Sequence, residues 1–244
     1  MRFVLSLCFI ALALFGVYMP GIGYAQVETE VEQPHIAFMR PVTRPETVGM
    51  AFYKTADGAA PDFRKWAEKT PKTLATPKFD RDVVVLSEFN RLQNEYINFA
   101  LDKPLYIRMP VSLSNYSTTK EILYLEEISP RIYFPFNLYG ENIVVMMKDI
   151  GKFSQIQLGG EAAYNLFQAV RNNKTAVVEL AVVPEIADVE RPLLINDINY
   201  LPMLTRVAEF VIWGGKDNAQ ALWVWRADWY RPSQNQDLMR LFQQ

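Results

Sequence analysis

The feature that most constrains the fold is a change in hydrophobic period near residue 104. Before it, apolar residues recur every three or four positions: Val85, Phe89, Leu92, Tyr96 and Phe99. This spacing predicts an amphipathic helix over about residues 79–100. After it, apolar residues alternate with mostly polar ones: Leu105, Ile107, Met109, Val111 and Leu113. The alternation predicts a half-buried strand, in which Pro110 favours a sheet edge or a bulge.

Further segments have strand character and are separated by turn residues: 121–128, 131–136, 142–148, 175–183, 203–213 and 220–230. The last two flank the turn-forming residues 214–218, which is the clearest hairpin pattern in the chain. A second helix is predicted at about 160–172, after two glycines. The sequence therefore predicts an α+β fold, mainly an antiparallel β-sheet with one long amphipathic helix and a second helix.

The first 25 residues have the composition of a secretory signal peptide. Arg2 precedes an apolar run, a Pro-Gly break follows, and small residues lead up to Ala25. The apolar run is shorter than the ~20 residues of a spanning helix. We therefore expect cleavage after Ala25 and a periplasmic or secreted protein, rather than an uncleaved anchor. No later stretch is long and apolar enough to span a membrane.

Two regions are expected in the rest of the chain. Residues 26–60 should form an extended, irregular arm, because Pro34, Pro41 and Pro45 each disfavour helix at the preceding residue. Residues 61–244 should form a single α+β domain.

Composition excludes several chemistries. The only cysteine, Cys8, lies in the predicted leader, so the mature chain has no disulfide, thiol nucleophile or cysteine metal site. The only histidine, His35, excludes a site with two imidazoles and lies in the arm, away from any nucleophile motif. The net charge is -2 and no basic block occurs, so we expect no nucleic-acid partner.

Two short patterns favour turns and helix starts over ligand sites. Asn196 and Asp197 lack the further carboxylates and the glycine of a calcium loop, so a turn rich in Asn and Asp is expected. Gly159 and Gly160 lack the other residues of a phosphate-binding loop. No cofactor and no metal are therefore predicted.

Carboxylate pairs are the remaining route to catalysis. The candidates are Glu126 with Glu127, Asp188 with Glu190, and Asp228. Adjacent acids in a strand point to opposite faces, which argues against the first pair. The second pair falls in a predicted loop. A carboxylate-dependent hydrolase acting on envelope glycans thus remains an alternative without a fixed carboxylate separation.

The C-terminal strand is unusually rich in tryptophan. Trp223, Trp225 and Trp229 share one face, and Arg226 and Asp228 lie on the other. An exposed row of indoles would suit glycan binding, and these three residues are the candidate ligand-binding residues. The polar opposite face favours burial of the tryptophans instead, under a helix such as residues 79–100.

The absence of catalytic motifs favours a non-enzymatic binding or interaction protein of the bacterial cell envelope, with a glycan or a protein as its partner. The alternatives are the glycan hydrolase and an accessory subunit of an envelope complex. No residue pattern in the chain identifies a known family.

Overall fold

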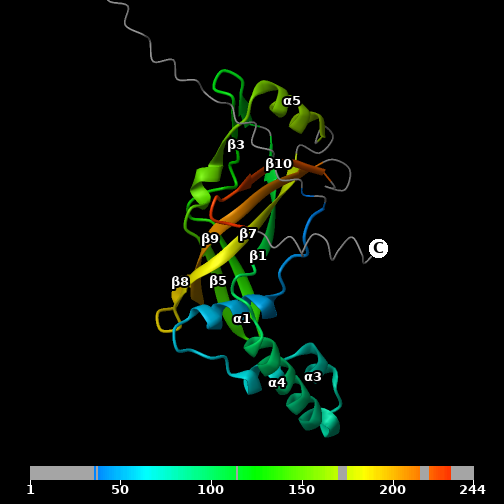
Figure 1. Ribbon diagram of the computed structural model, residues 1–244. Helices are drawn as coiled ribbons and strands as arrows, with labels where there is room; N and C mark the ends of the chain where they lie inside the picture. Colours follow the sequence, from blue (N-terminus) through cyan, green and yellow to red (C-terminus); the bar gives the residue numbers. More distant parts are fainter. Residues whose placement is uncertain (1–35, 37, 114, 170–174, 215–219, 232–244) are drawn as a thin grey trace, which may run out of the picture. The chain divides into compact units, whose positions relative to one another are not determined.

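Both the helices and the strands expected from the sequence occur in the computed structural model, which describes residues 36, 38–113, 115–169, 175–214 and 220–231 (Figure 1). The helices are α1 (Pro45–Thr55), α2 (Phe63–Glu68), α3 (Pro71–Ala75), η1 (Lys78–Asp80), α4 (Arg81–Ile97), η2 (Ile150–Ser154) and α5 (Gly160–Ala169). The strands are β1 (Leu105–Ser112), β2 (Asn115–Ser117), β3 (Ile122–Tyr124), β4 (Tyr133–Leu138), β5 (Glu141–Met147), β6 (Gln155–Gln157), β7 (Thr175–Ala187), β8 (Leu193–Ile195), β9 (Ile198–Gly214) and β10 (Gln220–Arg226). The α+β prediction is confirmed, and α4 and α5 are the two predicted helices.

The main sheet is built around β9. Its strand order is β1-β7-β9-β5-β4, and β10 and β8 also pair with β9. The pairs are antiparallel except for β5 with β9, which is parallel. β1 lies at the edge, as Pro110 predicts, because proline lacks the N–H that a central strand would need. A smaller sheet has the order β2-β3-β6.

Two tight hairpin turns have positive φ angles at both central residues. They are Tyr139–Gly140, which joins β4 to β5, and Asn196–Asp197, which joins β8 to β9. Such two-residue turns match the twist of the strands that they connect. The expected turn at Asn196 and Asp197 is confirmed.

The structure differs from the expected irregular arm where α1 begins. Pro45 occupies the first turn of this helix, where the missing N–H has no intrahelical acceptor to lose. Val48, Ala51 and Phe52 are fully buried in the core, and this packing stabilises a helix that the prolines alone argue against. The strand expected at 121–128 is also shorter, covering only β3.

The main core lies on one face of the large sheet. Residues from β5, β7 and β9 pack there against α1, η2 and the small sheet: Ile143, Leu180, Phe210, Phe52, Phe153 and Leu123. A second cluster joins α1, α2 and α4 to the end of β4 through Met50, Trp66, Leu92 and Leu138. Gly49 allows this approach, since a Cβ atom there would lie 2.0 Å from Leu138. No described helix has both the length and the apolar character needed to cross a membrane.

Candidate functional site

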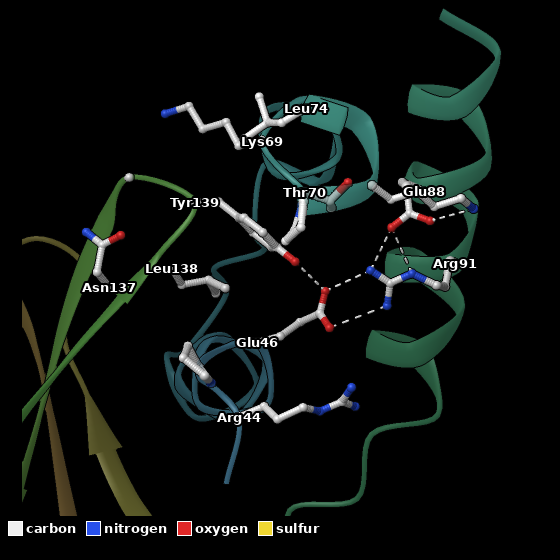
Figure 2. A pocket seen from close by; sticks show the side chains of 14 residues that line it. Arg44, Glu46, Lys69, Thr70, Leu74, Glu88, Arg91, Asn137, Leu138 and Tyr139 are labelled. Carbon is white, nitrogen blue, oxygen red and sulfur yellow. Dashed lines mark hydrogen bonds and ion pairs between the residues drawn. The ribbon is translucent and has the colours of Figure 1, made fainter. Parts of the chain in front are cut away.

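A pocket of about 800 Å³ lies where the helical cluster meets the β4–β5 turn. Its walls come from the start of α1, the α2–α3 connection, α4 and the turn at Tyr139–Gly140 (Figure 2). The charged residues that line it are Arg44, Glu46, Lys69, Lys72, Glu88 and Arg91. Cations therefore outnumber carboxylates among the lining residues.

Arg91 of α4 joins the two carboxylates of the pocket (Figure 2). Its Nη2 atom lies 2.8 Å from Oε1 of Glu46 and 2.9 Å from Oε2 of Glu88. Glu88 also pairs with Lys72, at 3.1 Å between Oε1 and Nζ. Both carboxylates are thus already neutralised by side chains of the protein.

Tyr139 is a further hydrogen-bond partner of the Glu46 carboxylate. Its hydroxyl donates a hydrogen bond to Oε1 of Glu46 at 2.7 Å. The backbone of Tyr139 has a φ of 51°, a conformation that few residues other than glycine adopt. The tight turn therefore holds Tyr139 in an unfavourable backbone conformation. In this conformation its hydroxyl lies against the carboxylate of Glu46 in α1.

These contacts determine the protonation of the pocket. Burial by itself raises the pKa of Glu46, but hydrogen bonds from Arg91 and Tyr139 outweigh burial and lower the pKa below its ordinary value. The pKa of Glu88 is likewise lowered, because Arg91 and Lys72 outweigh the effect of burial. Burial and the neighbouring Glu46 raise the pKa of Tyr139. At neutral pH the acids are ionised and the phenol keeps its proton.

Two cations of the pocket have no hydrogen-bonded or ion-paired carboxylate among the described residues: Arg44 and Lys69. The Lys69 side chain lies against the β4–β5 turn, where a Cβ atom on Gly140 would come within 2.6 Å of Nζ. Gly140, with a φ of 85°, therefore permits both the turn and the approach of the ammonium group. Arg44 and Lys69 leave the pocket with excess positive charge.

This arrangement suits the binding of an anion better than acid–base catalysis. Carboxylates with lowered pKa values are poor proton donors at neutral pH. No cluster of potential metal ligands occurs among the described residues. A carboxylate or phosphate group entering the pocket would meet Arg44 and Lys69, with Thr70 and the apolar side chains of Leu74 and Leu138 beside them.

No protein-family model, curated protein or solved structure matches the chain. The function is therefore argued from the residues themselves.

The tryptophans predicted as ligand contacts lie elsewhere. Trp223 and Trp225 of β10 are half-buried and pack on the main core, whereas Trp229 follows the strand and is 42% exposed. The ring centroids of Trp225 and of Phe153 in η2 lie 4.9 Å apart. The prediction that residues 79–100 cover these tryptophans is wrong, because α4 packs on α2 and α3 instead.

The proposed carboxylate pairs make local contacts. Glu127 accepts a hydrogen bond from the backbone of Ser112, and Glu126 accepts one from Asn115. Asp188 accepts hydrogen bonds from the backbone N–H groups of Glu190 and Arg191. None of these acids, nor Asp228, lines the pocket. His35 lies outside the described residues.

The sequence reasoning missed a buried ion network on the other face of the main sheet. Glu179 of β7 and Glu209 of β9 have fully buried side chains. Arg40 pairs with both, Arg108 with Glu179, and Arg226 with Glu209. Burial lowers the pKa of Arg40, but the two glutamates outweigh burial and raise it above its ordinary value. A single acid within each of the apolar runs 176–183 and 207–213 was the available signal.

Proposed function

We propose that this protein is an exported, non-enzymatic binding protein of the bacterial cell envelope, and that its pocket binds an anionic group of the ligand. The observation that carries the proposal is the state of the pocket's charges. Glu46 and Glu88 are paired with Arg91, while no carboxylate of the described residues is hydrogen-bonded to or ion-paired with Arg44 or Lys69. An anionic ligand would supply the missing partner.

The size and composition of the pocket support a ligand larger than an inorganic ion. Its volume of about 800 Å³ is within the usual range for small-molecule sites. Pro45, Pro71, Leu74 and Leu138 provide apolar surface beside the cations. Fragments of cell-wall glycan whose attached peptides carry carboxylates have this combination of charge and apolar surface, and are the class of ligand that we propose.

The test uses the protein expressed from the full sequence and recovered from the periplasm of a bacterial host. Soluble peptidoglycan fragments with free carboxylates are titrated into it by calorimetry. We expect binding that weakens with salt, because the contacts are between charges. The double variant Arg44→Gln/Lys69→Gln should lose at least about tenfold in affinity, equivalent to about 1.4 kcal/mol.

Arg64→Gln is the matched control. The Arg64 side chain lies on α2, outside the pocket, and is 79% exposed. The substitution therefore removes one cation from the same helical region without changing the pocket. This variant should bind like the wild type. Equal binding by the double variant, or no binding of carboxylate-bearing fragments by the wild type, would contradict the pocket proposal. Failure to recover the protein from the periplasm would contradict export separately.

A further inference from the structure

The outward face of α4 has an exposed stripe without charge. Val83, Leu86 and Ile97 have exposed fractions of 74%, 61% and 63%. Asn90 and Gln93 lie between them on the same face, and both are exposed. We call these five residues the α4 seam. Phe79, immediately before the helix, is 99% exposed.

The α4 seam is separate from the face that stabilises the fold. Leu92 is fully buried, and Val85, Phe89 and Tyr96 pack in the same cluster with Trp66 of α2. On a helix with 3.6 residues per turn, the seam residues lie about 100–180° around the helix from Leu92, outside the face that packs on Trp66. The charged residues Glu88 and Arg91 face the pocket instead. Folding of this chain therefore leaves the apolar residues of the seam without cover from any described residue.

The spacing of the α4 seam is that of a two-stranded coiled coil. Intervals of three, four, three and four residues separate positions 83, 86, 90, 93 and 97. This pattern assigns Val83, Asn90 and Ile97 to a positions, and Leu86 and the polar Gln93 to d positions. Branched residues at a with leucine at d favour two parallel strands, and a single asparagine at a favours a dimer.

We propose that a second copy of this chain binds the α4 seam, through parallel pairing of the two α4 helices about a two-fold axis. Each seam residue then meets its own counterpart, so Asn90 can exchange hydrogen bonds with Asn90 of the second copy. The seam has no charge that would repel itself across the axis. This inference does not depend on the ligand of the pocket.

The same residues argue against the other possible occupants. A lipid bilayer would leave the amides of Asn90 and Gln93 without hydrogen-bond partners. A wholly apolar partner helix would do the same. A self-pairing surface satisfies the central amide while it covers Leu86 and Val83. One short helix pair covers less than the ~1,600 Å² of a standard interface, so we expect a weak, concentration-dependent dimer.

Sedimentation velocity of the protein recovered from the periplasm tests this proposal. From about 1 to 500 µM we expect the wild type to shift from monomer to dimer. Leu86→Glu should weaken the dimer by more than about tenfold, since each copy would place an unpaired carboxylate in the interface. The matched control is Leu194→Glu, because Leu194 of β8 is 68% exposed and lies outside the α4 seam.

Disulfide formation tests the parallel register. Without Cys8 of the leader the chain has no cysteine, so Val83→Cys introduces the only thiol. Two parallel helices bring this residue close to its counterpart, and mild oxidation should give a covalent dimer. Leu194→Cys should remain monomeric. The proposal is overturned by a wild type that is monomeric at every concentration, by a Leu86→Glu protein that still forms the dimer, or by equal cross-linking of the two cysteine variants.

Binding of the wild type to anionic lipid vesicles, with loss of this binding in Leu86→Glu and no dimer in solution, would assign the α4 seam to a membrane surface and would likewise overturn the proposal. Circular dichroism of each variant checks that the fold is unchanged. We expect no change, because Val83 and Leu86 are exposed in the folded chain.

Discussion

Arg40 and Glu179 are 139 residues apart in the sequence and are joined by two hydrogen bonds. The backbone N–H of Arg40 donates to Oε2 at 2.9 Å, and Nε donates to Oε1 at 2.7 Å. The same guanidinium pairs with Glu209 on the neighbouring strand. The segment before α1 is thus attached to both central strands of the sheet through a single residue, Arg40.

Replacement of Arg40 by methionine should lower the free energy of unfolding by about 3 kcal/mol, because it leaves two fully buried carboxylates with fewer cations. Urea unfolding measures this change. Arg191→Met is the control, since its guanidinium is 88% exposed although it pairs with Asp188 at a similar distance of 2.7 Å. That variant should lose at most about 1 kcal/mol. An equal loss in the two variants would show that burial of the network is not what makes Arg40 important.

Stability should fall in acid because of Glu46 and Glu88. Their folded-state pKa values lie below the ordinary value of 4.5, so their contribution is complete above that pH and is lost as the pH falls through the folded-state values. Arg91→Gln removes the shared cation and should flatten the fall in unfolding free energy between about pH 5 and 3. Arg64→Gln, on α2 and outside the pocket, should leave the slope unchanged. A slope that Arg91→Gln does not alter would contradict the assignment.

Gly140→Ala should affect both the turn and the pocket. The positive φ should cost about 1–2 kcal/mol of stability, and the new Cβ atom should displace Nζ of Lys69. Gly58→Ala separates the two effects, since Gly58 also has a positive φ, of 71°, but has no atom within 4 Å of a built Cβ. Both variants should lose stability in thermal unfolding, and only Gly140→Ala should bind the carboxylate-bearing fragments more weakly. Normal binding by Gly140→Ala would show that the position of Lys69 Nζ against the turn is not needed for binding.

The tryptophans should differ in accessibility to acrylamide. Trp229 is 42% exposed, whereas Trp66 and Trp213 are fully buried. Trp229→Phe should therefore remove the most strongly quenched part of the fluorescence. Trp223→Phe, which removes a half-buried ring, should lower quenching less. If Trp223→Phe had the larger effect, β10 would be more open than its packing on the core indicates, and the glycan-surface hypothesis would regain support.

The hydrophobic period within a segment predicted those helices and strands that bury one face. The period of α4, the alternation in β1 and the edge position of Pro110 follow from side chains within one segment. α1 was missed because its stability comes from burial of Val48 and Phe52, whereas the prediction rested on the prolines at and before its start. The parallel pairing of β5 with β9 was missed because it joins strands that are distant in the chain.

The pocket was missed for a related reason. Its charged residues come from positions 44 to 91, and the turn that closes it lies at Tyr139–Gly140. Nothing in any one of these segments indicates that Arg91 will meet Glu46 or that Lys69 will lie over a glycine. The unusual tryptophan content of β10 attracted attention instead, although Trp223 and Trp225 mainly pack against the core.

The central position of β9 also determines when this protein can fold. β9 spans Ile198–Gly214 and pairs with β5, β7, β8 and β10, so the main sheet lacks its middle strand until most of the chain has been synthesised. Contacts between distant segments slow folding and delay it until both partners are present. A nascent chain of this design can complete its small sheet, but it cannot complete its main sheet before β9 has been synthesised.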